Sequence, residues 1–133
     1  MSLPAAVVYG PAAIRESYEM LSKQLAAAEA VEMRADGALR QAAEEVRHRE
    51  RRVKEIETIR AQTERGLAAA EGTPAVDRFR AQLEAAEVEL KARRERLDHV
   101  AKFRDERQAE YDAAFAKAAA LRNRLKAIAE AAL

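Results

Sequence analysis

An unbroken heptad repeat on two long stretches constrains the fold of this chain more than any other feature. No proline occurs from Ala12 to Ala70, and neither proline nor glycine occurs after Pro74. In both stretches the candidate seam positions recur in alternating steps of three and four residues, which is typical of a left-handed supercoil. The seam positions are Ile14, Tyr18, Leu21, Leu25, Ala28, Glu32, Ala35, Leu39, Ala42, Val46, Arg49, Val53, Ile56, Arg60, Thr63 and Leu67, then Val76, Phe79, Leu83, Ala86, Leu90, Arg93, Leu97, Val100, Arg104, Arg107, Tyr111, Ala114, Ala118, Leu121, Leu125 and Ile128. The repeat predicts two long helices that each bury one seam.

The EGTP segment between the two stretches has the residues of a tight turn. Gly72 can adopt the left-handed conformation that ends a helix, and Thr73 is a preferred residue for capping the next one. A turn this short makes the helices antiparallel, so the chain is expected to be all-α: a long antiparallel two-helix coiled-coil hairpin, with self-association left open. The expected boundaries are an extended apolar segment over 1–11 and a helical hairpin over 12–133, with helices at 12–70 and 75–132 and the turn at 71–74.

Antiparallel pairing of the seams places apolar residues opposite apolar or small ones. It sets Leu25 opposite Leu121 and Ile56 opposite Leu90. Five seam positions hold arginine instead, and polar seam residues lower stability while they help to fix register. We therefore expect the middle of the seam to open more readily than the leucine-rich part near the chain ends. The seam arginines are Arg49, Arg60, Arg93, Arg104 and Arg107.

Composition excludes several classes of protein. The 133 residues suit one domain, the formal net charge is only +1, and cysteine is absent, so disulfides and thiolate metal sites are ruled out. No apolar run is long enough to span a bilayer, and the opening segment lacks the basic start of a signal peptide. We expect a cytoplasmic protein, or a virion-associated one in a phage. Arginine outnumbers lysine, which hints at a GC-rich bacterial or phage source.

Two basic segments are expected to lie at the same height on the hairpin. RHRERRVK at 47–54 holds five lysines and arginines against one glutamate, and KARRER at 91–96 holds four against one. One interpretation is a docking site for an acidic partner or for a phosphate backbone. The other is a solvated face that its own carboxylates neutralise. We define the basic belt as Arg47, Arg51, Arg52, Lys54, Lys91, Arg94 and Arg96.

Apolar residues also occur where a two-helix seam cannot bury them. The segment LPAAVVY at the N-terminus does not join the heptad repeat. It is either a loose tail, a segment that folds back along the hairpin, or one that adds to a partner's groove or sheet edge. Other apolar side chains lie beside the seams, where they are either alanine-rich filler or a contact surface. The candidate contact residues, called the apolar base and N-terminus, are Leu3, Val7, Val8, Tyr9, Val31, Phe103 and Phe115.

Catalytic patterns are missing from the sequence. It holds no glycine-rich phosphate loop, no nucleophile motif and no metal-ligand spacing. His48 and His99 share a heptad position without a third ligand, so solvated histidines are the expectation. We therefore expect no enzymatic activity, no cofactor and no metal.

The architecture resembles that of small helical-hairpin stalk and adaptor proteins, among them the flagellar and type III export stalk proteins. It is also similar in outline to some phage assembly proteins and to isolated helical arms of larger enzymes. The likeness is one of outline over most of the chain, so it assigns no functional residue. It implies a non-enzymatic interaction protein: a stalk, adaptor or scaffold subunit of a bacterial or phage assembly such as a secretion or virion machine. Protein partners are expected, with a homo-oligomer as one form. The alternative is a nucleic-acid-associated protein that binds phosphates through the basic belt.

Overall fold

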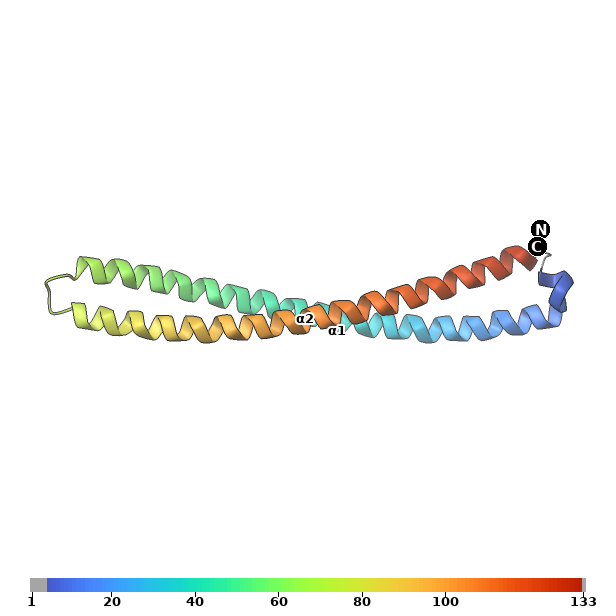
Figure 1. Ribbon diagram of the computed structural model, residues 1–133, viewed down its shortest axis with the longest axis horizontal. Helices are drawn as coiled ribbons and strands as arrows, with labels where there is room; N and C mark the ends of the chain where they lie inside the picture. The colour runs from blue at the N-terminus through green and yellow to red at the C-terminus, as the bar shows by residue number, and fades with distance from the viewer. Residues whose placement is uncertain (1–4, 133) are drawn as a thin grey trace. The chain divides into compact units, whose positions relative to one another are not determined.

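The computed structural model describes the backbone of residues 5–132 and the side chains of residues 10–131. It contains two long helices that pack against each other, α1 (Ala5–Ala69) and α2 (Val76–Ala132), and no strand occurs over that range (Figure 1). The all-α helical hairpin that the heptad repeats predict is therefore confirmed. None of the described helices has a stretch that is both long and apolar enough to cross a bilayer.

Helix α1 begins earlier than the sequence suggests. Residues 5–9 are helical, where an extended segment was expected. Alanine is the strongest helix former, and Ala5 and Ala6 open this helical turn. Gly10 then interrupts the helix with a φ of 78° and a ψ of 162°, and Pro11 starts the next helical stretch.

The turn between the helices follows the glycine prediction but not the threonine one. Gly72 has a φ of 77°, so it adopts the left-handed conformation that ends α1. The Thr73 hydroxyl donates a 2.6 Å hydrogen bond to the carbonyl of Ala70, and its backbone N–H donates to the same oxygen at 2.9 Å. Thr73 thus satisfies an orphan carbonyl at the end of α1. At the start of α2, the N–H of Val76 donates to the Thr73 carbonyl at 3.3 Å.

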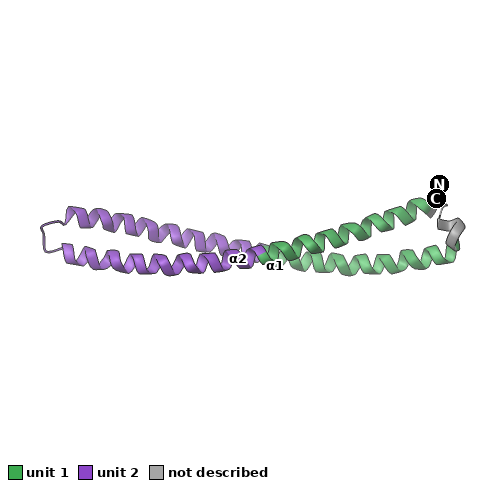
Figure 2. Ribbon diagram, viewed as in Figure 1, with its two compact units in different colours: residues 1–39, 106–133 green, residues 40–105 purple. Residues whose placement is uncertain are grey.

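The chain divides into two compact units, each made of a segment of α1 and a segment of α2 (Figure 2). Unit 1 comprises Met1–Leu39 and Glu106–Leu133, and unit 2 comprises Arg40–Asp105. The core of unit 1 gathers buried Leu21, Ala28, Ala118 and Leu121, with Leu25, Leu125 and Ile128 packed against them. The core of unit 2 gathers Val53, Ile56 and Leu90, with Leu97 packed against them.

Burial follows the predicted seams closely. Every buried residue in the described part of the chain is a seam position, apart from Ala70, which continues the repeat of α1 by one step. Ile56 and Leu90 are only 1% and 2% exposed. Burying side chains of this size stabilises the fold by ~1.5–3 kcal/mol each. The small exposed fractions of these residues confirm that the repeat selects the face each helix turns inward, whereas the predicted seam residue Tyr18 is 45% exposed.

A close approach occurs next to the turn in unit 2. The ring of half-buried Phe79 lies over Gly66, where a Cβ atom would come within 2.5 Å of the ring's Cε1 atom. The guanidinium of Arg78 lies 5.3 Å from the centroid of the same ring. Gly66 therefore provides the space that the Phe79 ring fills.

Candidate interaction surfaces

All seven residues of the basic belt belong to unit 2, but only two of them form ion pairs between described residues. Arg52 Nη2 lies 3.2 Å from Glu89 Oε1 on the facing helix, and its Nη1 lies 3.1 Å from Glu55 Oε2. Arg94 Nη2 lies 3.2 Å from Glu57 Oε1. Exposed pairs of this kind stabilise by only ~0–1 kcal/mol each. Two arginines of the basic belt therefore form ion pairs between α1 and α2.

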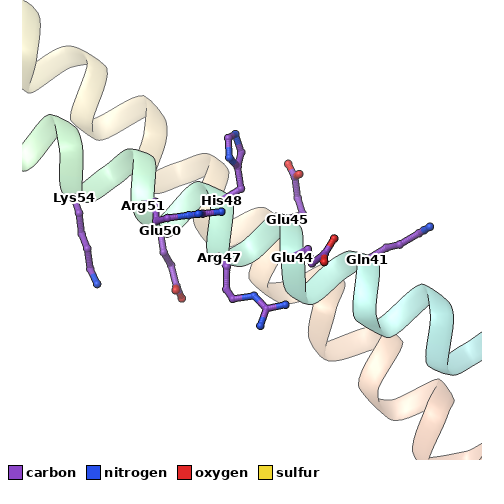
Figure 3. Close-up of a pocket in the computed structure, with 8 residues that line it drawn as sticks. All are labelled: Gln41, Glu44, Glu45, Arg47, His48, Glu50, Arg51 and Lys54. Carbon is purple, nitrogen blue, oxygen red and sulfur yellow. The ribbon is translucent and has the colours of Figure 1, made fainter.

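The other five residues of the belt are exposed and enter none of the ion pairs between described residues. Three of them, Arg47, Arg51 and Lys54, lie on α1 at a spacing of four and three residues and line one shallow hollow on that helix (Figure 3). The remaining lining residues are Gln41, Glu44, Glu45, His48 and Glu50. All of these lining residues come from a single helix, so the hollow is a surface feature and not an interhelical cleft.

Carboxylates are interspersed among the cations of this hollow. Glu44, Glu45 and Glu50 line it beside the three basic residues, and Glu45 also pairs with Arg49 at 2.9 Å. A phosphate backbone laid along the hollow would meet these negative charges as well as the cations, and like charges repel. The mixed charge therefore suits a partner surface that itself carries both signs better than it suits a polyanion.

The seam arginines each have a carboxylate on their own helix. The distances range from 2.6 Å for Arg107 and Glu110 to 3.8 Å for Arg93 and Glu89. Long arginine stems can cover a seam while the guanidinium reaches its counter-ion near the surface. The remaining pairs are Arg49 with Glu45, Arg60 with Glu64 and Arg104 with Asp105.

An apolar groove runs between α1 and α2 within unit 1. Its floor includes Ala28, Ala114 and Leu121, which are at most 9% exposed, whereas Val31 on its wall is 47% exposed. Val31 was a predicted contact residue, but the rest of the groove was not predicted, because an alanine on the seam gives no sign that it leaves space. The other lining residues are Gln24, Ala27 and Lys117.

The two phenylalanines of the apolar base lie in different units. Phe115 belongs to unit 1, is 50% exposed, and its ring centroid lies 6.2 Å from that of Tyr111. Phe103 belongs to unit 2 and is 47% exposed. The remaining candidates, Leu3 and the side chains of Val7, Val8 and Tyr9, lie outside the described residues.

Further large apolar side chains are exposed that sequence analysis did not name. Met33 in unit 1 is 75% exposed and Val88 in unit 2 is 72% exposed. Their signal in the sequence is an apolar residue off the heptad seam. Both units therefore present apolar surface that their own helices do not cover.

Both histidines are exposed, and only His48 lines the hollow of Figure 3. Over the described part of the chain, no three His, Asp or Glu side chains gather in a way that could hold a metal ion. Comparisons with profiles of known protein families, with curated proteins and with solved structures gave no match.

Proposed function

We propose that this protein is a non-enzymatic coiled-coil interaction protein: a stalk, adaptor or scaffold subunit of a larger bacterial or phage assembly, such as a secretion or virion machine. It works in the cytoplasm or within a virion. The observation that carries the proposal is the exposed apolar surface on the flanks of both units. Its clearest members are Val31 and Phe115 in unit 1 and Val88 and Phe103 in unit 2.

The physical argument rests on how a two-helix hairpin uses its apolar residues. One seam per helix is enough to hold the two helices together, and the seam positions of both units account for nearly all of the buried residues. Apolar side chains elsewhere add nothing to that seam and leave hydrophobic area in water. A partner that covers one half-exposed phenylalanine gains roughly 1 kcal/mol from its remaining area, and several such residues together add up to a useful affinity.

Partner capture from extracts of the source organism tests this proposal. Phe115→Glu and Val88→Glu place a charge on the apolar surface of each unit, and we expect at least one of them to lose a partner that the wild-type chain retains. Gln62→Glu is the matched control, because it adds the same charge at an exposed polar position. Circular dichroism confirms that each variant is helical. Capture of the same proteins by the wild-type chain and by both variants contradicts the proposal.

A second function is supported by the part of the basic belt that forms no ion pair with another described residue. Arg47, Arg51 and Lys54 form an exposed basic stripe on α1, so we also propose binding of phosphate backbone as the alternative. Titration of a DNA or RNA duplex at low and moderate salt tests it. Micromolar binding with a steep salt dependence supports the alternative. No binding at low salt, or equal binding by the Arg47→Glu and Arg51→Glu double variant, removes it.

A further inference from the structure

The groove of unit 1 follows the direction of its two helices. On α1 it is lined by Gln24, Ala27, Ala28 and Val31, which follow the i, i+3, i+4, i+7 pattern of one helix face. The residues from α2 are Ala114, Lys117 and Leu121, at i, i+3 and i+7. Seven residues of helix correspond to roughly 10 Å. The groove therefore runs lengthwise between the helices for about two turns.

Small residues leave the groove open. Ala28 and Ala114 occupy seam positions where a leucine would fill the space between the helices, and the opening has a volume of about 410 Å³. Interiors of proteins are close-packed, and they leave few voids larger than a water molecule. An elongated apolar opening between two helices matches the groove into which a third helix packs its side chains.

The charge beside the groove indicates which charged side chain a third helix would bring to it. Among the described residues that line the groove, Lys117 is the only charged one, and it enters none of the ion pairs between described residues. The carboxylates of Glu29 and Glu32 in the same unit are both occupied by Arg122, at 3.5 and 3.4 Å. The ammonium group of Lys117 is therefore available to a carboxylate from outside the chain.

The same charge argues against a second copy of this chain. Two copies that dock groove to groove about a two-fold axis present the same patch to each other. Each copy then brings its own Lys117 to the shared rim, where like charges repel. A partner helix with carboxylates beside its apolar face meets no such repulsion.

We propose that the groove of unit 1 binds an amphipathic helix of a protein partner, with apolar side chains over Ala28 and Ala114 and a carboxylate paired with Lys117. This inference rests on the proposed interaction function and names the partner's chemistry. It places the third helix on the flank that contains Val31. The ion pair at the rim gives preference for an acidic helix, and the apolar floor gives affinity.

Two labelled synthetic peptides test the proposal by fluorescence anisotropy. Both are amphipathic helices with leucine on one face, and they differ only in carrying glutamate or lysine beside that face. The wild-type chain is expected to bind the glutamate peptide about two- to five-fold more tightly than the lysine peptide at low salt, the range for one partly exposed ion pair. Lys117→Glu is expected to reverse this preference without changing the helical content.

Variants in the two units separate the groove from other apolar surface. Val31→Asp is expected to weaken binding of the glutamate peptide at least ten-fold, because it places a charge on the groove wall. Ile59→Asp is the matched control: it places the same charge at a β-branched apolar residue of unit 2 that is 49% exposed, close to the 47% of Val31, and it is expected to bind like wild type. Circular dichroism establishes that both variants are folded.

Each other outcome overturns the inference. Failure of both peptides to bind, equal affinity for the two, an unchanged preference in Lys117→Glu, or equal weakening by Val31→Asp and Ile59→Asp refutes the assignment. If the wild-type chain self-associates in sedimentation experiments and Val31→Asp abolishes this association, the groove binds a second copy of the chain instead. If the peptides fail while partner capture still depends on Phe115 or Val88, the proposed function stands and only the groove inference falls.

Discussion

Replacing Gly66 with alanine is expected to lower stability, although alanine is the better helix former. A glycine-to-alanine change inside a helix stabilises the helix by about 1 kcal/mol through its higher helix propensity. At Gly66 the new Cβ would lie 2.5 Å from Cε1, 2.9 Å from Cδ1 and 3.1 Å from Cζ of the Phe79 ring. Such contacts are too short to persist, so the ring must turn away from α1.

The cost of moving that ring offsets the gain in helix propensity. Complete burial of a phenylalanine side chain stabilises by ~1.5–3 kcal/mol, so losing the contacts of half-buried Phe79 costs roughly half of that. The Arg78 guanidinium, 5.3 Å from the ring centroid, loses a contact worth ~0.5–1 kcal/mol at an exposed site. After the gain of about 1 kcal/mol in helix propensity is subtracted, the net change for Gly66→Ala is a destabilisation of about 0.3–1.5 kcal/mol.

Gly37 provides the matched control. It also lies inside α1, but a Cβ atom added there meets nothing within 4 Å. Gly37→Ala is therefore expected to stabilise by about 0.5–1 kcal/mol, so the two variants should differ by about 1 kcal/mol or more. Urea unfolding followed by circular dichroism measures both free energies.

A double-mutant cycle with Phe79→Leu isolates the contact. In that background the ring is absent, so Gly66→Ala should regain the stabilising effect seen at Gly37. Equal stabilisation by Gly66→Ala and Gly37→Ala in the wild-type background would refute the reasoning. It would show that the Phe79 ring finds an equally good position when the space over residue 66 is filled.

Three further outcomes follow from the turn, the interhelical ion pairs and the seam. Gly72→Ala should lower the free energy of unfolding by about 1–2 kcal/mol, because an alanine is strained at a φ of 77°; an unchanged urea midpoint would show that the turn relaxes. Arg94→Ala should cost at most ~1 kcal/mol at low salt and nothing measurable at high salt, since its pair with Glu57 is exposed; a loss that salt does not reduce would contradict this. Changing Arg93 and Arg104 together to leucine should raise the melting temperature, because apolar side chains would fill the seam, and a lower melting temperature would show that their ion pairs stabilise the native seam. Hydrogen exchange in wild type should also be faster around these two arginines than around the leucine-rich seam of unit 1.

The seam was predictable from the sequence because a spacing of 3.5 residues leaves one stripe of each helix facing the partner. Leu21, Ile56 and Leu90 are buried for that reason. The left-handed glycine of the turn was predictable as well, since Gly72 is one of few residues in the chain that adopt a positive φ without strain.

The side-chain contacts that the sequence did not predict are those in which one residue type can bind several different partners. A threonine hydroxyl can accept a hydrogen bond at the start of a helix or donate one at the end of the preceding helix, and the path of the turn decides that Thr73 donates to Ala70. Long side chains add a second source of error, because they reach diagonally across the hairpin. Arg52 thus finds Glu89, which pairing of residues at equal height does not suggest.

The groove escaped prediction for a related reason. Heptad analysis identifies which alanines face the seam, but it does not say whether the neighbouring residues close over them. At Ala28 and Ala114 they do not, and the difference depends on side-chain positions in three dimensions. Sequence therefore located the seam but not the gap within it.

Two interhelical ion pairs restrict how a chain of this kind can change its length: Arg52 with Glu89, and Arg94 with Glu57. Each pair joins residues 37 positions apart across the turn. Adding a few residues to one helix alone would shift every pair on the side of the insertion away from the turn and would rotate the seam away from its partner. Lengthening that preserves the core must add whole heptads to both helices at the same height. Natural variants of this hairpin are therefore expected to differ in length by steps of about fourteen residues, with insertions occurring in matched pairs.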